Sequence, residues 1–126
     1  MTTPIRVLLV EDSDVYRESL VFLLRRRDGI DVVGAVADGA SAVASAADLR
    51  PDVVVLDYRL PDVDGGEVAE ELRERAPGAA IVFLSASAGR EEYDAAAIAS
   101  ASLVRKDDGI DALVAAVRAV VGRSDG

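Results

Sequence analysis

Short runs of apolar residues alternate along this chain with longer segments in which apolar residues recur every three or four positions. The short runs predict five strands, at residues 5–10, 31–36, 53–57, 80–85 and 103–105. The longer segments predict five helices, at residues 14–27, 40–49, 65–75, 91–100 and 109–121. Such an alternation is typical of an α/β protein with a doubly wound parallel sheet, for which we expect the strand order 2-1-3-4-5.

Residues that favour helix ends mark where several of these helices begin or stop. Gly29 follows the first helix and is expected to be its C′ residue. Asp64 is expected to cap the third helix, with Glu67 completing a capping-box pattern, and Asp108 is expected to cap the fifth. The apolar stripe of the first helix consists of Tyr16, Leu20, Leu23 and Leu24.

The composition supports one domain with a real core and limits its partners. The chain has 126 residues, of which 51% are hydrophobic, and we expect a domain at 1–121 and a flexible tail or the start of a linker at 122–126. A net charge of −9 argues against direct binding to nucleic acid and favours cationic ligands. No apolar stretch reaches the roughly 20 residues that cross a bilayer, and no secretory segment is present, so we expect a cytoplasmic location without membrane contact.

The chain contains neither cysteine nor histidine. Disulfides, thiol catalysis and zinc–thiolate sites are therefore excluded. Any general base must be a carboxylate or a lysine, and any phosphohistidine must come from another protein.

Three acidic residues directly follow or end predicted strands. Asp57 ends an apolar run whose branched aliphatic residues indicate a strand buried on both faces, and Glu11 and Asp12 follow the first strand. If the first and third strands are neighbours, the three carboxylates converge at one edge of the sheet. A hard divalent cation, Mg²⁺ or Mn²⁺, would relieve their repulsion. Because Mg²⁺ is usually bound by phosphate oxygens as well as carboxylates, the cluster also predicts a phosphoryl group beside the metal. The alternative is that Glu11 and Asp12 are solvated acids at a helix start.

Two further residues with phosphate-binding chemistry end the fourth and fifth strands. They are Ser85, a small hydroxyl, and Lys106, a point charge. Taken singly, they are an ordinary turn serine and an ordinary surface lysine. The chain has neither the Gly-x-x-x-x-Gly-Lys-Ser/Thr phosphate loop nor a Gly-x-Gly-x-x-Gly dinucleotide loop. What remains is a carboxylate nucleophile, a metal, a lysine and a hydroxyl, and a carboxylate can attack phosphorus to form an acyl phosphate.

These residues resemble the receiver domain of two-component response regulators over residues 5–121. The matching motifs are Glu11-Asp12, Asp57-x-x-x-Pro61-x-x-x-Gly65, Ser85-Ala86 and Lys106. Within that family the chain is most similar to the LuxR-type (NarL/FixJ-like) subgroup, which often has an aspartate after the lysine, as at Asp107 here. The resemblance implies a flavodoxin-like fold and a signalling domain that catalyses only its own phosphorylation and dephosphorylation.

The resemblance also implies a role for each motif residue. Asp57 would accept a phosphoryl group from a histidine kinase or a phosphotransfer protein in a Mg²⁺-dependent reaction. The metal ligands would be Glu11, Asp12, Asp57 and the backbone carbonyl of Arg59. The phosphoryl group would be bound by Ser85, the backbone amide of Ala86 and Lys106, and its lifetime would be tuned by Arg59 and Ser87. The switch would change the face formed by the fourth helix, fifth strand and fifth helix, and would control an output domain, a partner or dimerisation.

The chain departs from the receiver pattern just before the fifth strand. Receivers usually read Gly-Ala-x-Gly-Tyr/Phe, whereas residues 99–103 read Ala-Ser-Ala-Ser-Leu, which puts Leu103 at the aromatic-switch position. Either the leucine packs inward permanently and alters the coupling, or it fills the same volume without effect. The alternative function is therefore a receiver-like protein-interaction module that works without phosphorylation.

Two other protein classes share parts of this pattern. A haloacid-dehalogenase-type phosphatase needs Asp-x-Asp, but Asp57 is followed by Tyr58-Arg59. A flavodoxin-like electron carrier needs a phosphate loop after the first strand, where this chain is acidic. LuxR-type receivers usually precede a C-terminal DNA-binding domain, which does not fit within these residues. The first and fifth helices are a candidate face for a homodimer.

Overall fold

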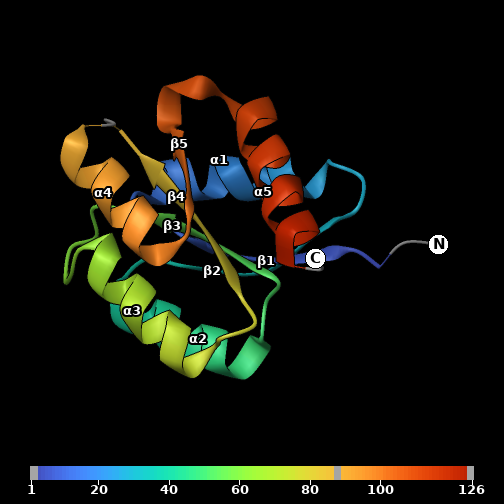
Figure 1. Ribbon diagram of the computed structural model, residues 1–126. Helices are drawn as coiled ribbons and strands as arrows, with labels where there is room; N and C mark the ends of the chain where they lie inside the picture. The colour runs from blue at the N-terminus through green and yellow to red at the C-terminus, as the bar shows by residue number, and fades with distance from the viewer. Residues whose placement is uncertain (1–2, 87–88, 125–126) are drawn as a thin grey trace.

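A parallel sheet forms the centre of the molecule, with its strands in the order β2-β1-β3-β4-β5 (Figure 1). The computed structural model describes residues 3–86 and 89–124. The strands in this part of the chain are β1 (Ile5–Val10), β2 (Ile30–Val36), β3 (Val53–Asp57), β4 (Ala80–Ser85) and β5 (Ser102–Arg105). The sheet has the order and the doubly wound arrangement that the sequence predicts.

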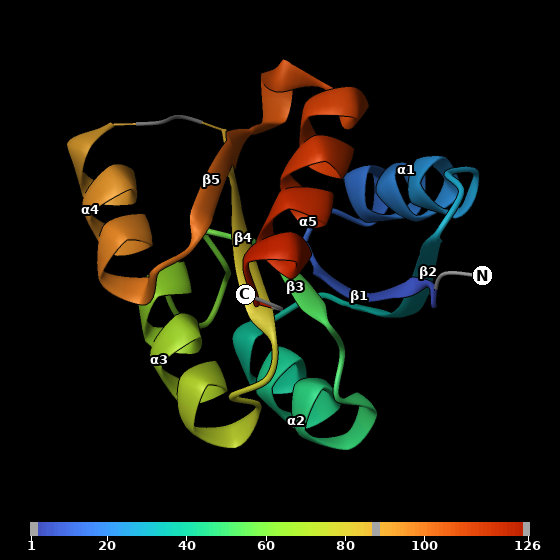
Figure 2. The same ribbon diagram turned by 45° about the vertical axis from the view of Figure 1, so that its right-hand side comes forward.

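Helices cover both faces of this sheet (Figures 1 and 2). Helices α1 and α5 lie on one face, and α2, α3 and α4 lie on the other. Their bounds are α1 (Asp14–Arg25), α2 (Gly39–Leu49), α3 (Gly65–Arg75), α4 (Arg90–Ala99) and α5 (Ile110–Ser124), with a short 3₁₀ helix, η1 (Lys106–Asp108), between β5 and α5. None of the helices in the described residues combines the length and the apolar content needed to cross a bilayer.

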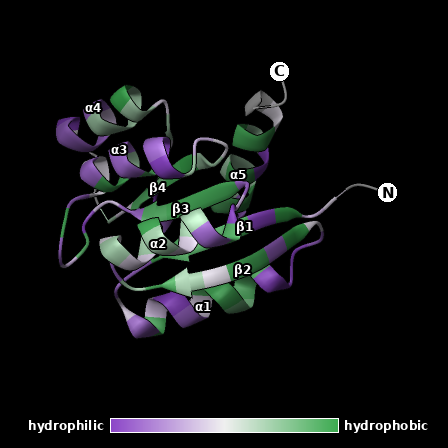
Figure 3. Cartoon of the chain, turned by 90° about the horizontal axis from the view of Figure 1, so that it is seen from below, coloured by the Kyte–Doolittle hydropathy of each residue, from purple (hydrophilic) through white to green (hydrophobic). Residues whose placement is uncertain are grey.

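Strand β3 explains why the middle of the sheet is uniformly apolar. Val53 and Val55 pack into the cluster beneath α1 and α5, while Val54 and Leu56 pack into the cluster beneath α2, α3 and α4. All four side chains are fully buried. Figure 3 shows hydrophobic residues along β3 and hydrophilic residues on the helices around it. A strand covered on both faces has no solvated side, so its sequence shows no alternation of polar and apolar residues.

The register of β1 and β3 sets the position of the acidic residues. Val10 lies opposite Leu56, so the chain continues into Glu11 and Asp57 at the same edge of the sheet. From this edge β1 leads to α1 on one face, whereas β3 leads to α3 on the other. Open α/β sheets bind ligands at such a switch point, in the crevice outside the carboxyl ends of the strands.

The end of α1 differs from the prediction. The helix ends at Arg25 rather than Arg27, and the amides of Arg26 and Arg27, which follow it, donate to carbonyls three residues back. Gly29 has a positive φ of 79°, but it lies in the turn before β2, so its prediction as the C′ residue was wrong. Leu23 is 38% exposed because it lies at the margin of the buried stripe, whereas Leu20 and Leu24 are buried.

Of the caps predicted for α3 and α5, the first is confirmed and the second was wrong. Asp64 caps α3 as expected, since its Oδ1 accepts from the amide of Glu67 at 3.0 Å. Asp108 does not cap α5; its Oδ2 accepts from the amide of Arg105 at 3.1 Å within η1, and Gly109, at φ 91°, leads into α5. Helix α5 continues through Ser124, so residues 122–124 are helical, and the domain boundary at 121 stays a prediction.

Gly65 stands where the backbone approaches too closely for a side chain. A Cβ at this position would lie 2.9 Å from the Cα of Tyr58 and 3.1 Å from Cε1 of Phe83. The amide of Gly65 donates to the carbonyl of Tyr58 at 2.6 Å, which closes the loop after β3 onto the start of α3. The glycine of the predicted motif is therefore required by packing beside the site.

We expect Gly65→Ala to lower the free energy of unfolding by about 1–3 kcal/mol, because the backbone of Tyr58 must move. Gly78→Ala is the matched control, since a Cβ there meets nothing within 4 Å. Its effect should stay within about 0.5 kcal/mol. Urea unfolding followed by circular dichroism measures both, and equal losses in the two variants would contradict the packing argument.

Candidate functional site

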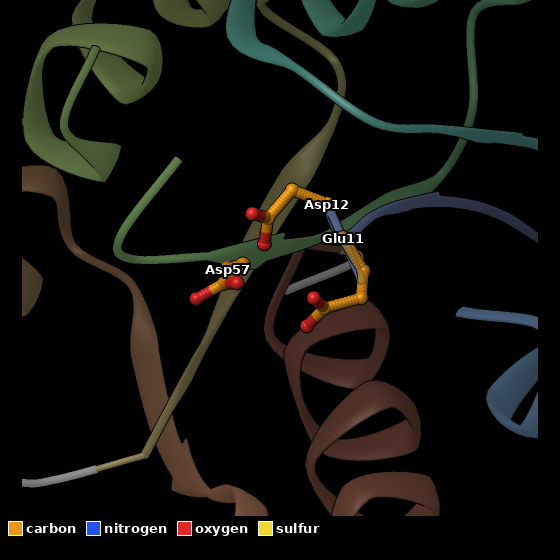
Figure 4. A group of neighbouring side chains, drawn as sticks. All are labelled: Glu11, Asp12 and Asp57. Carbon is orange, nitrogen blue, oxygen red and sulfur yellow. The ribbon is translucent and has the colours of Figure 1, made fainter. Parts of the chain in front are cut away.

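The three acidic residues singled out from the sequence meet at the carboxyl ends of β1 and β3 (Figure 4). Glu11, Asp12 and Asp57 each offer one carboxylate oxygen, and these oxygens all lie within 4.8 Å of one another. Glu11 is fully buried, Asp57 is buried and Asp12 is exposed. The expected convergence is therefore observed, and two of its three members are removed from water.

Lys106, directly after β5, provides the compensating positive charge. As the first residue of η1, it places Nζ 2.7 Å from Oε1 of Glu11 and 3.3 Å from Oδ2 of Asp57. Its side chain is only 25% exposed. A buried carboxylate without such a partner would be costly, so Lys106 is part of the site rather than a solvated surface lysine.

Backbone hydrogen bonds hold the two buried carboxylates in position. The amide of Ser13 donates to Oε2 of Glu11 at 2.9 Å, and the amide of Arg59 donates to Oδ1 of Asp57 at 3.1 Å. Arg17 donates from Nη1 to the carbonyl of Glu11 at 2.8 Å, which ties this loop to α1. The partner of Oε1 of Glu11 within the described residues is the ammonium of Lys106, at 2.7 Å. This buried oxygen is therefore already paired with a cation.

The electrostatics of the site separate the two buried acids. Burial, and then the nearby charge of Glu11, raise the pKa of Asp57 to about 6, although Lys106 and the Arg59 amide act in the opposite direction. Burial also acts to raise the pKa of Glu11, but the contacts with Lys106 and the Ser13 amide outweigh it and hold that pKa below its ordinary value. Burial would lower the pKa of Lys106, yet its contacts with Glu11 and Asp57 keep it raised. The resting site therefore holds an ionised Glu11 paired with a charged Lys106.

The other predicted residues lie around this centre. Ser85 is buried at the end of β4, where Asp57 pairs with the preceding Leu84, and Ala86 follows it as an exposed residue. Leu103 lies on β5 opposite Phe83 and packs, half-buried, against the cluster beneath α2, α3 and α4. Ser87 falls outside the described residues.

Arg59 connects the loop after β3 to helix α4. Its side chain is 69% exposed, and Nη2 lies 3.5 Å from Glu91 and 3.4 Å from Glu92. Glu92 is buried, and its Oε2 accepts from the amide of Gly89 at 2.6 Å. The sequence analysis missed Glu92, because an acid in the first turn of a helix normally serves only the helix terminus.

Tyr16 is a second residue that the sequence analysis did not assign to the site. Its ring centroid lies 4.8 Å from Nζ of Lys106. The helical period correctly put Tyr16 on the inward stripe of α1, but it could not reveal that a lysine 90 residues later would lie over the ring.

Comparison with known proteins identifies the class to which this fold and site belong. Residues 7–118 match the response regulator receiver domain, and the chain belongs to this family. It is 38% identical over 122 residues to the probable transcriptional regulatory protein TcrX of Mycobacterium tuberculosis, covering 96% of this chain and 51% of the relative. It is 36% identical over 107 residues to a protein-glutamate methylesterase/protein-glutamine glutaminase of Koribacter versatilis, covering 83% of this chain and 30% of the relative.

Solved structures agree with this assignment. A LuxR-family two-component response regulator from Aurantimonas has a TM-score of 0.89 and 31% identity, covering 96% of this chain and 86% of that one. The receiver domain of the putative response regulator NarL from Mycobacterium tuberculosis has a TM-score of 0.84 and 29% identity, covering 99% of both chains. The chain spans about half or less of the curated relatives it matches, and these carry different functions beyond the shared part.

The raised pKa of Asp57 predicts that this residue costs stability at neutral pH. Between about pH 4 and pH 6 the folded state binds more protons at Asp57 than the unfolded state, so stability falls as pH rises through this window. We expect Asp57→Asn to raise the free energy of unfolding at pH 7, with chelator present, by roughly 1–3 kcal/mol. The gain should disappear below about pH 4, where the wild-type carboxyl is protonated in both states.

Asp62→Asn is the control of opposite sign. The amides of Gly39 and Ala40 donate to the Asp62 carboxylate, and the Gly39 amide in particular holds the pKa of Asp62 below its ordinary value. Its charge therefore contributes stability at neutral pH that is lost as pH falls through the folded-state pKa, so Asn should lower the unfolding midpoint at pH 7. Urea titrations at pH 7 and below about pH 4 measure the stability of both variants. A loss of stability in Asp57→Asn at pH 7 would contradict the electrostatic account.

Proposed function

We propose that this chain is a phosphoacceptor of a two-component signalling system and that Asp57 accepts the phosphoryl group. One observation carries the proposal: Asp57 lies together with Glu11, Asp12 and Lys106 at the carboxyl edge of the sheet. A nucleophile, acidic groups suited to a cation and a fixed ammonium are the parts that phosphoryl transfer to a carboxylate needs. Membership of the receiver family supports the same conclusion.

We propose Mg²⁺, or Mn²⁺ in its place, as the cofactor. Its ligands would be Glu11, Asp12, Asp57 and the backbone carbonyl of Arg59. The fit rests on the oxygen cluster, in which one carboxylate oxygen from each of the three acids lies within 4.8 Å of the others. A bound divalent cation would neutralise charge on the incoming phosphoryl group.

In the proposed reaction a carboxylate oxygen of Asp57 forms the new P–O bond. The bond between phosphorus and the donor breaks at the same time, and its electron pair stays on the donor. With a phosphohistidine donor the imidazole leaves and takes a proton; with acetyl phosphate the leaving group is acetate. The histidine must belong to a partner, because this chain has none. Lys106 stabilises the charge on the phosphoryl oxygens in the transition state.

The new phosphoryl group would carry roughly two negative charges and additional acceptor oxygens. Ser85, the amide of Ala86 and Lys106 would bind these oxygens, and Arg59 and Ser87 would tune the lifetime of the acyl phosphate. About 5.5 kcal/mol moves a two-state equilibrium from 1:99 to 99:1. Three or four charge-assisted hydrogen bonds supply that order of magnitude. The responding face would be α4, β5 and α5, and Arg59 links the site to this face through Glu91 and Glu92.

The proposed partners are a histidine kinase or a phosphotransfer protein, with the cytoplasm as the location. Relatives that are transcription regulators suggest a C-terminal DNA-binding domain as one output, and the methylesterase relatives suggest that the output differs between proteins sharing this domain. Helices α1 and α5 are the proposed dimer face. The net charge of −9 argues against direct nucleic-acid binding by this domain itself.

We expect Asp57→Asn to abolish label uptake from acetyl [³²P]phosphate in the presence of Mg²⁺, because the nucleophilic oxygen is lost. Asp52→Asn is the matched control: Asp52 precedes the same strand at its opposite end and accepts from the Arg6 amide at 2.9 Å. This control should take up label like the wild type. Chelation of the metal should stop label uptake in the wild type and in Asp52→Asn. Label uptake by Asp57→Asn would contradict the assignment of Asp57 as the phosphoacceptor.

Lys106→Ala should separate metal binding from switching. The three carboxylates remain in this variant, so calorimetry should still detect Mg²⁺ binding. Phosphorylation should no longer shift the amide NMR signals of α4, because the ammonium that binds the new phosphoryl oxygens is gone. If phosphorylation shifts the α4 amide signals of Lys106→Ala as far as those of the wild type, the ammonium is not part of the switch.

A further inference from the structure

Tyr16 contacts the reactive centre in a way that its place on α1 does not require. The ring is half-buried, and Nζ of Lys106 lies 4.8 Å from its centroid. This separation is within the roughly 6 Å over which an ammonium is attracted to the face of an aromatic ring. The lysine side chain is 25% exposed, so solvent screens the contact only in part.

The ring is the one contact of Lys106 in the described site that is neither the proposed phosphoacceptor nor a proposed metal ligand. The ammonium otherwise contacts Glu11 and Asp57. Asp57 loses its carboxylate when it becomes an acyl phosphate, and a cation bound by Glu11 would compete with the lysine for that oxygen. A lysine is a point charge on a flexible four-carbon stem, so a fixed neighbour would limit the positions of its ammonium while its ionic partners change.

Tyr16 packs against the core cluster beneath α1 and α5, and its ring also lies beside the ammonium. Leu20 and Leu24, one and two turns later on α1, are buried in that core. The Tyr16 ring borders a hollow of about 180 Å³ that is also lined by Leu20, Lys106 and Ile110. No hydrogen bond of the Tyr16 hydroxyl occurs within the described residues, so the ring face, rather than the hydroxyl, makes the contact with the site. Burial raises the pKa of Tyr16, which keeps the phenol neutral.

We propose that Tyr16 is a positioning residue for Lys106, whose ring holds the ammonium beside Asp57 before and after the acyl phosphate forms. The role of the ammonium in phosphoryl transfer rests on the proposed function above. The ring–ammonium contact is a property of the resting protein and can be tested separately.

Lys106 is the only lysine of the chain, which makes that test direct. In protein labelled with ¹³C-lysine, one set of Cε–Hε signals should appear upfield of the free amino-acid position, because the protons lie over the Tyr16 ring. Tyr16→Phe keeps the ring and should keep the shift, whereas Tyr16→Leu should abolish it. Phe22→Leu is the control: Phe22 is a 60% exposed residue of the same helix whose ring lies under Arg26 at 5.3 Å, so its loss should leave the lysine signal unchanged.

A double-mutant cycle tests whether the contact matters for phosphorylation. Tyr16→Leu should slow phosphorylation by acetyl phosphate by about five- to tenfold, the range expected for loss of a partly desolvated cation–π contact. Tyr16→Phe should restore most of the rate. In the Lys106→Ala background, Tyr16→Leu should have no further effect, because it acts through the lysine.

Each result decides one claim. A wild-type lysine signal at the free amino-acid position would overturn the contact, even if Tyr16→Leu fails to fold. Equal rate losses from Tyr16→Leu with and without Lys106 would show a merely structural role. Uptake of phosphoryl label by Asp57→Asn would overturn the proposed function, but it would not affect the evidence for the ring–ammonium contact.

Discussion

Two buried carboxylates can share one edge of the sheet because the ammonium of Lys106 contacts both. Without that charge, Glu11 and Asp57 would repel each other in a crevice where water no longer screens them. The pairing also ties the first, third and fifth strands together, since the three residues follow β1, end β3 and begin η1 after β5. A change in the charge of Asp57 therefore alters a contact that reaches across the sheet.

The loop after Asp57 provides a second connection, from the site to helix α4. Its first two residues both contact helix α4: Tyr58 donates from its hydroxyl to Glu91 at 3.4 Å, and Arg59 pairs with Glu91 and Glu92. Tyr58 also packs edge-on against Phe83 on β4, with ring centroids 5.8 Å apart. Leu103 lies opposite Phe83 on β5, and the contacts of Tyr58 and Arg59 link the site to α4 without it.

Shared architecture and separate outputs go together in this family. The relatives include transcription regulators and methylesterases, and the chain matches the part that they have in common. The site depends on the ends of four strands, whose positions follow from the buried core. The large side chains of Phe22, Tyr93 and Ile98 are exposed and lie outside the acidic cluster.

The sequence by itself determined the order of the elements, the doubly wound sheet and the convergence of Glu11, Asp12 and Asp57. The spacing of apolar residues and the position of the acids at the ends of apolar runs are local features, so they can be read directly from the sequence. It was less successful at element ends, where Gly29 and Asp108 serve turns other than those predicted. Only the tertiary structure decided that Glu92 would be buried beside Arg59 and that Tyr16 would lie under Lys106. These contacts join residues 33 and 90 positions apart, and they depend on how two helices lie against the sheet, which no periodicity in either segment encodes.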